Sequence, residues 1–88
     1  MKDYRTRFVS GNDQSVRYFG FGDSRKLVYV DSGMEHTFIF SKGNEESIVK
    51  KINETLGSSG NTIDSYVSGI IYAKLTFGEP EPELKLVV

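Results

Sequence analysis

The chain has 88 residues, a formal net charge of −1, no cysteine and one histidine. This length predicts that residues 1–88 form a single domain, near the lower limit for folding without disulfides or metals. The missing cysteines exclude a disulfide framework, and the near-neutral charge excludes a bulk attraction to nucleic acid. No apolar run is long enough to cross a membrane and no signal peptide is recognisable, so we expect a cytoplasmic protein.

The first half of the sequence predicts β-structure. Short segments there alternate in polarity or are rich in β-branched and aromatic residues, and turn clusters separate them. Because the connections are short, we expect an antiparallel meander whose first two strands form a hairpin. The third segment is apolar on both faces, which indicates a central strand. The predicted strands are Tyr4–Val9, Ser15–Phe21, Lys26–Asp31 and Glu35–Ser41.

A clear amphipathic helix is predicted over about residues 45–56. Asn44 is a suitable N-cap, and Gly57 is expected to end the helix in a left-handed conformation. A single apolar stripe recurs at helical spacing and predicts packing on one face of the sheet. The stripe consists of Ile48, Val49, Ile52 and Leu56.

The segment after the helix admits two interpretations. Residues 62–71 fit helical spacing, whereas the β-branched content and Gly69 favour a strand over Gly69–Phe77, which is the assignment we prefer. A final short edge strand is expected at Leu84–Val88. The predicted fold is therefore α+β: an antiparallel meander of about four strands, one helix on one face, and one or two further strands.

Catalysis finds little support in the sequence. A Ser–His–acid arrangement would require His36, which we expect to be an exposed residue at the start of a strand. One histidine and scattered carboxylates do not form a metal-binding pattern. We therefore expect a protein that is not an enzyme and that has no cofactor or metal.

One basic and aromatic segment suggests a surface for single-stranded nucleic acid. In the segment Arg17–Phe21, the rings of Phe19 and Phe21 share one strand face with Arg17, so bases are able to stack there if that face is open. Arg5 and Arg7 share a face on the strand expected to be its neighbour. Aromatic residues at alternate strand positions are more often core residues, so we expect both phenylalanines beneath the helix.

A proline-spaced acidic segment offers a third feature. Glu79, Glu81 and Glu83 alternate with prolines in an extended, negatively charged loop. Such a loop is able to enter a basic groove on another protein as a charge mimic. The competing interpretation is a connection that its charge keeps soluble.

The function predicted from these observations is binding of a protein partner, with modulation or inhibition of that partner. Small cysteine-free chains of this style are common among phage and mobile-element inhibitors, which is an association and not a deduction. One alternative is a single-stranded nucleic-acid binder. The other is a structural homodimer that pairs through its exposed sheet face or its last strand. The residues of the nucleic-acid alternative are Arg5, Arg7, Arg17, Phe19 and Phe21.

Overall fold

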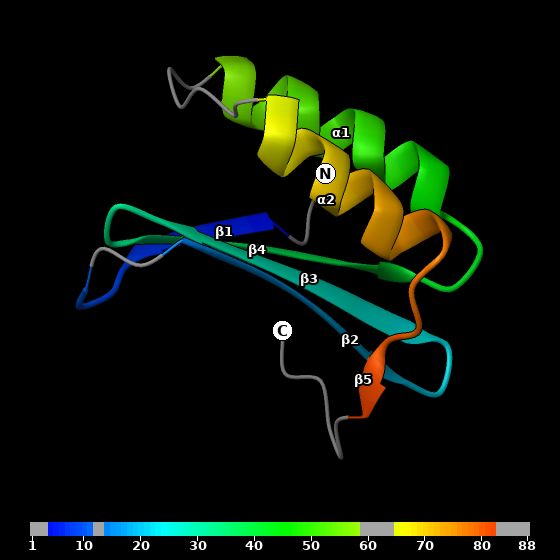
Figure 1. Ribbon diagram of the computed structural model, residues 1–88. Helices are drawn as coiled ribbons and strands as arrows, with labels where there is room; N and C mark the ends of the chain where they lie inside the picture. Colours follow the sequence, from blue (N-terminus) through cyan, green and yellow to red (C-terminus); the bar gives the residue numbers. More distant parts are fainter. Residues whose placement is uncertain (1–3, 12–13, 59–64, 83–88) are drawn as a thin grey trace.

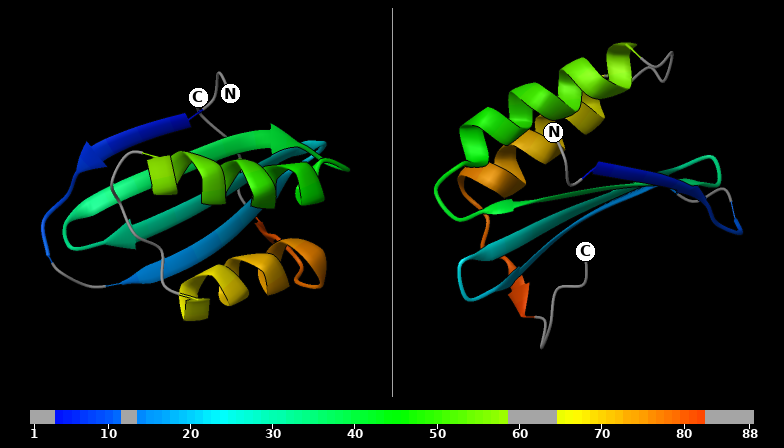
Figure 2. Two further views of the ribbon diagram at one scale, coloured as in Figure 1. Left: turned by 90° about the horizontal axis from the view of Figure 1, so that it is seen from above. Right: turned by 180° about the vertical axis from the view of Figure 1, so that it is seen from behind.

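The computed structural model describes residues 4–11, 14–58 and 65–82 and has an α+β architecture. Two helices, α1 (Glu45–Ser58) and α2 (Ser65–Thr76), lie side by side over one face of a five-stranded sheet (Figures 1 and 2). The predicted fold class, with four antiparallel strands and a helix on one sheet face, is confirmed. The second helix corresponds to the helical interpretation of residues 62–71, which we did not prefer.

The sheet has the strand order β1-β4-β3-β2-β5. Strands β2, β3 and β4 follow one another as an antiparallel meander, β1 adds to β4 in antiparallel orientation, and β5 adds to β2 in parallel orientation. The strands are β1 (Tyr4–Phe8), β2 (Ser15–Phe21), β3 (Ser24–Asp31), β4 (Met34–Ser41) and β5 (Glu81–Pro82).

The predicted hairpin between the first two strands is wrong. Strand β1 pairs with β4, so β3 and β4 separate it from β2. The chain leaves β1 past the β3–β4 turn, where the backbone N–H of Val9 donates to the carbonyl of Gly33 over 2.7 Å. A Cβ at Gly33 would lie 3.3 Å from the carbonyl oxygens of Val9 and Gly11, and its φ of 82° also favours glycine. This turn therefore requires a residue without a side chain.

Helix α1 follows the sequence pattern closely. The carbonyl of Asn44 accepts the first helical hydrogen bond, from the N–H of Ile48 over 3.0 Å, as expected at an N-cap position. The helix continues through Gly57 to Ser58, and Gly57 does not adopt a positive φ, so the predicted left-handed stop is wrong. The buried stripe of α1 is Ile48, Ile52 and Leu56.

Helix α2 replaces the strand predicted over Gly69–Phe77. Val67, Ile71 and Leu75 recur every four residues and are buried, so the helix covers the part of the sheet that α1 leaves free. The alternation that favoured a strand arose because α2 is apolar on both sides. Tertiary packing beside α1 outweighs the unfavourable helix propensity of Gly69 and the β-branched residues.

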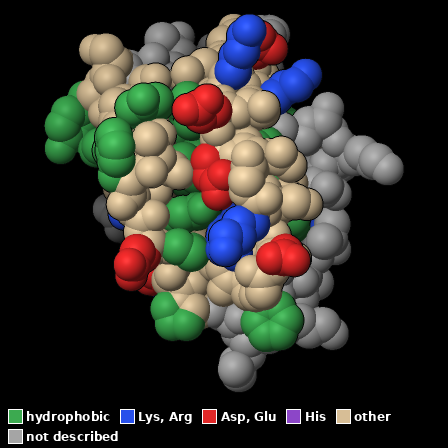
Figure 3. Space-filling model, turned by 90° about the vertical axis from the view of Figure 1, so that its right-hand side faces the viewer, with side chains coloured by type: hydrophobic (Ala, Val, Ile, Leu, Met, Phe, Trp, Pro, Cys, Tyr) green, Lys and Arg blue, Asp and Glu red, His purple; other side chains and the backbone are tan. Residues whose placement is uncertain are grey.

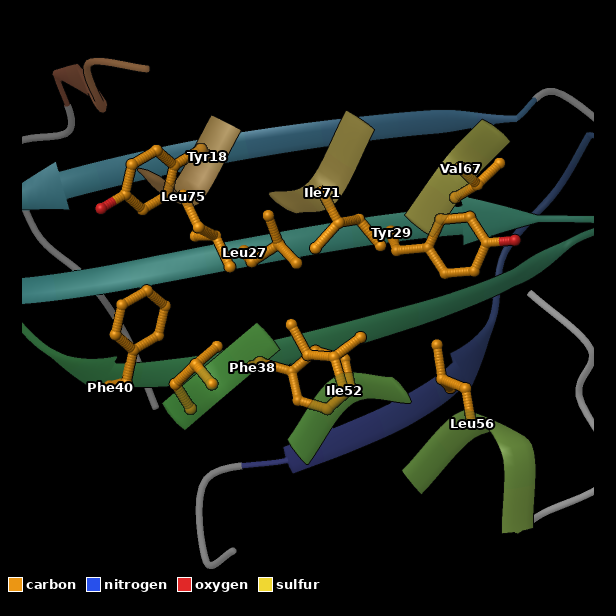
Figure 4. Packing of buried hydrophobic residues seen from close by; sticks show 11 residues of the cluster. Tyr18, Leu27, Tyr29, Phe38, Phe40, Ile52, Leu56, Val67, Ile71 and Leu75 are labelled. Carbon is orange, nitrogen blue, oxygen red and sulfur yellow. The ribbon is translucent and has the colours of Figure 1, made fainter. Parts of the chain in front are cut away.

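The core lies between the helices and the sheet, where side chains from both layers point toward one another (Figure 4). Tyr18 of β2 is part of this core and stacks against Phe40 with ring centroids 6.2 Å apart. Because successive strand residues face opposite sides, Phe19 and Phe21 point away from the helices. The expectation that these two phenylalanines lie beneath the helix is therefore wrong.

The acidic segment forms part of the sheet. Glu81 and Pro82 pair with Phe19 and Gly20 as the short strand β5, where only an extended loop was expected. A Cβ at Gly20 would lie 2.9 Å from Pro80, so Gly20 allows the chain to approach β2 closely here. The strand predicted at Leu84–Val88 lies outside the described residues.

Candidate functional site

The residues proposed for nucleic-acid binding gather on the sheet face turned away from the helices. The strand registers place all of them on that face together with Lys26, which is the direct cross-strand partner of Phe19. On the neighbouring strand β4, Ile39 is the cross-strand partner of Lys26 and shares this face, but it is buried. We call this surface the basic-aromatic face, and it consists of Arg5, Arg7, Arg17, Phe19, Phe21 and Lys26.

The arginines lie on the same face but not on neighbouring strands. Arg5 pairs with Thr37, Thr37 with Val28, and Val28 with Arg17, so one row of side chains crosses the sheet between the two arginines. The prediction that β1 and β2 are neighbours is thus wrong, although Arg5 and Arg17 do share a face. Strand spacing of about 4.8 Å places their backbones about 14 Å apart.

Arg17 contacts both Glu81 and Phe19 on the basic-aromatic face. Its guanidinium donates to both carboxylate oxygens of Glu81, over 2.7 and 3.3 Å, and lies 4.9 Å from the centre of the Phe19 ring. The ammonium group of Lys26 lies 5.0 Å from the same ring centre. The hydrogen bonds from Arg17 lower the pKa of Glu81, so this carboxylate stays ionised at a lower pH than usual.

A hollow of about 220 Å³ lies on the β1 side of this face. Three cations contribute to its wall, and Arg7 donates to the carboxylate of Glu35 over 3.2 Å. The side chain of Arg7 is 72% exposed, so this ion pair contributes little to stability. The lining residues are Arg5, Arg7, Lys26, Glu35 and Thr37.

The three glutamates proposed as a charge mimic do not form one surface in the described structure. Glu79 is exposed after α2, Glu81 is held against Arg17, and Glu83 lies outside the described residues. Because Arg17 already neutralises Glu81, the segment is less able to imitate a free polyanion than its sequence suggested. The geometry therefore does not favour this segment as the binding surface.

The outer side of α2 is an apolar surface that we did not predict from the sequence. Tyr66, Tyr72 and Phe77 are 75%, 49% and 78% exposed, and the rings of Tyr72 and Phe77 meet edge to face with centroids 6.3 Å apart. Ile70 and Ala73 lie on the same side of the helix as Tyr66, at i+4 and i+7. Tyr72 lies about 120° around the helix from Tyr66 and joins this surface through its ring contact with Phe77. The available signal was the helical interpretation of residues 62–71, in which Tyr66 and Ile70 lie beside the core positions Val67 and Ile71. We call this surface the α2 outer face, and it consists of Tyr66, Ile70, Tyr72, Ala73 and Phe77.

A hollow of about 320 Å³ extends the α2 outer face toward the start of β2. Tyr66 and Ile70 contribute to its wall from α2, and Val16 contributes from the sheet. The described part of the chain places no strand beside residues 15–17 on the outer edge of β2, since β5 pairs only with Phe19 and Gly20. An apolar helix face and a strand edge therefore adjoin here.

A hollow of about 570 Å³ lies where the start of α1 meets the end of α2. Figure 3 shows this end of the molecule, with acidic, basic and apolar side chains interspersed. Burial and the nearby Glu45 carboxylate raise the pKa of Tyr18, whereas Arg25 opposes the increase. The hydroxyl of Thr76 is buried at this end without a hydrogen-bond partner. The mixture of charges indicates no particular ligand.

His36 is buried in the core rather than exposed at a strand end. Only 2% of the residue is accessible, because it lies on the helix-covered side of β4. Its Nδ1 is within hydrogen-bonding distance of the Thr6 hydroxyl, 2.9 Å away, and of the Tyr4 hydroxyl, 3.2 Å away. Burial lowers the pKa of His36, and the opposing attraction of Asp31 is weaker. The sequence-based expectation failed because both faces of β4 carry polar and apolar residues.

Neither metal ligands nor a membrane span can be identified in the part of the chain that the structure describes. Over those residues, no three acidic, histidine or cysteine side chains come close enough to hold a metal ion. The described helices are too short or too polar to cross a bilayer. The chain matches no protein-family model, and comparison with curated proteins and with solved structures gave no match.

Proposed function

We propose that the protein is a non-catalytic binding module that engages another protein through the α2 outer face. The observation that carries this proposal is the exposure of three aromatic side chains on and just after one short helix. Aromatic side chains are enriched at protein interfaces, where a few of them supply most of the binding energy. His36 is buried beneath the helices with its Nδ1 beside the Thr6 and Tyr4 hydroxyls, and this inaccessibility supports a role without catalysis.

The chemistry of the α2 outer face indicates what the partner must offer. Lys74 is the only charged residue of α2, so the helix presents a nearly uncharged ridge. Tyr66, Ile70 and Ala73 follow the i, i+4, i+7 spacing with which a helix enters an apolar groove. We therefore infer that the partner is a protein with an apolar groove rather than a charged surface.

The size of the surface sets a further requirement. An aromatic side chain buries roughly 150–250 Å², so the exposed parts of these three offer about 400 Å². A stable interface needs about 800 Å² from each partner. The hollow between α2 and β2 adjoins the helix and supplies a direction in which the interface is able to extend. The proposed interface therefore includes the outer edge of β2.

A capture experiment tests this proposal. The wild-type chain, a Tyr66→Ala/Phe77→Ala variant and a Phe8→Ala control are tagged and incubated with nuclease-treated lysate of the source organism. Phe8 is a matched control because, like Phe77, it is 78% exposed, but it lies at the end of β1. We expect the wild type and the control to retain the same protein in equal amount. We expect the double variant to retain at least about tenfold less of it.

Two results would overturn the proposal. Equal retention by all three chains would show that the α2 outer face does not bind the partner. A dimer at micromolar concentration in sedimentation, converted to a monomer in the double variant, would assign the surface to a second copy of this chain instead.

A further inference from the structure

The basic-aromatic face carries local positive charge on a protein whose net charge is −1. Among the described residues, four cations share this face with two carboxylates, which leaves an excess of two positive charges. The carboxylates, Glu35 and Glu81, each pair with an arginine. Three cations surround the hollow on the β1 side. Local charge of this kind attracts an anion at short range even where the whole molecule does not.

Aromatic side chains lie beside these cations. The Phe19 ring has a cation within 5.0 Å of its centre from both Arg17 and Lys26. Phe21 lies two residues further along the same strand face and is 52% exposed. An exposed ring two residues from Phe19 and its cations matches a nucleotide, because a base is able to stack on Phe21 while the phosphates meet the cations around Phe19.

The spacing fits a short stretch of single strand. Arg5 and Arg17 are three strand spacings apart, or about 14 Å, which equals about four stacked nucleotides at about 3.4 Å each. Site sizes of about 4–16 nucleotides are usual for sheet surfaces that bind single strands. A rigid duplex is disfavoured because the stacking ring must reach an unpaired base.

We propose that the basic-aromatic face binds single-stranded nucleic acid, with phosphates in the hollow between Arg5, Arg7 and Lys26 and a base stacked on Phe21. In the free protein, the carboxylate of Glu81 binds the guanidinium of Arg17 in the way that a phosphate would. The bidentate contact of 2.7 and 3.3 Å shows that this guanidinium accommodates a two-oxygen anion. Glu81 therefore competes with the nucleic acid, and β5 weakens binding. This site is separate from the α2 outer face.

The salt dependence of binding follows from the number of cations. Each phosphate neutralised on a single strand contributes about −0.7 to the slope of log K against log salt. Arg7 is counted because it makes a single, exposed contact of 3.2 Å with Glu35, whereas two contacts of 2.7 and 3.3 Å hold Arg17 against Glu81. Three contacts around the hollow therefore predict a slope of about −2 for the wild type. Removing the competing carboxylate adds Arg17 as a fourth contact, so Glu81→Gln is expected to bind about fivefold more tightly with a slope steeper by about 0.7.

Fluorescence anisotropy with a labelled twenty-nucleotide oligothymidylate, from 20 to 200 mM salt, tests the proposal. Lys26→Ala and Phe21→Ala are each expected to weaken binding about fivefold, and only Lys26→Ala is expected to reduce the salt slope. Lys50→Ala removes an exposed positive charge from α1 and is the matched control, with no expected change. Thermal unfolding of each variant confirms that it folds.

The same titration identifies the results that overturn the proposal. These are no binding by wild type or Glu81→Gln at 20 mM salt, unchanged affinity in Glu81→Gln, or equal losses in Lys26→Ala and Lys50→Ala. Equally tight binding of a polyglutamate of the same charge would assign the face to acidic peptides. The Tyr66→Ala/Phe77→Ala variant is expected to bind the oligonucleotide like wild type, so failure here is distinguishable from failure of the proposed protein-binding function.

Discussion

The two helices bury equivalent apolar stripes against the same sheet face but present opposite chemistry to solvent. Ile52 of α1 and Ile71 of α2 are both buried, and each lies at the centre of its stripe. Outward, α1 exposes Lys50 and Glu54, whereas α2 exposes Tyr66. Because each helix covers the sheet with its own buried stripe, the aromatic outer side of α2 is not needed for this packing. This difference is the main reason to look for a binding surface on α2.

The largest expected effect tests whether the two inner stripes are equivalent. Ile52→Ala and Ile71→Ala are each expected to lower the free energy of unfolding by about 2–5 kcal/mol, because each leaves a cavity in the core. Urea denaturation measures both. A loss below about 1 kcal/mol for Ile71→Ala alone would mean that α2 packs only loosely on the sheet. The inner stripes of the two helices would then not be equivalent.

A second prediction concerns the pH dependence of stability that buried His36 causes. Burial lowers its pKa, so the folded protein holds this proton more weakly than the unfolded chain. The stabilisation by neutral histidine is complete above about pH 6.5, the usual value, and is lost as pH falls from there toward the folded-state pKa. We expect urea denaturation to show lower stability at pH 5.5 than at pH 7.5.

The control for this pH dependence is His36→Gln, which cannot take up a proton. Its free energy of unfolding is expected to change less than that of the wild type over the same interval. An identical decrease in both proteins would assign the pH dependence to other groups.

A smaller effect is expected at Gly69, in the exposed side of α2. A Cβ at this position would meet no atom within 4 Å, and the residue lies in a helix interior. Gly69→Ala is therefore expected to raise the free energy of unfolding by about 0.5–1 kcal/mol. Destabilisation, measured by urea denaturation, would contradict the helical assignment of this segment.

The smallest effects are expected from the two outer sides themselves. Lys50→Ala on α1 and Tyr66→Ala on α2 are each expected to change the free energy of unfolding by no more than about 0.5 kcal/mol. A loss above about 2 kcal/mol for Tyr66→Ala would show that this ring belongs to the fold. The comparison between the helices would then no longer indicate a binding role.

The contrast between α1 and α2 also explains what was predictable from the sequence. Helix α1 has one apolar stripe and one charged side, so only helical spacing describes it. In α2 both sides are apolar, so the positions from Gly69 to Phe77 also fit a strand. Local pattern does not distinguish these two structures, and packing against α1 and the sheet decides between them.

The strand order and the faces of β2 were not predictable for similar reasons. The pairing of β1 with β4 joins residues about thirty positions apart, as in Tyr4 with Phe38, and no local turn signal reports it. Strand β2 has aromatic residues on both faces, so alternation alone does not show that Tyr18 rather than Phe19 enters the core. The contact of Arg17 with Glu81 spans 64 residues. It depends both on the strand order of the sheet and on which face of β2 enters the core.

The most direct test of the α2 outer face is site-specific photocrosslinking in the presence of lysate. One chain has a photoreactive phenylalanine analogue in place of Tyr66, and a second has it in place of Lys50 on α1. We expect the protein retained in the capture experiment to crosslink from position 66 and not from position 50. Crosslinking from position 50 alone would contradict the assignment of binding to α2.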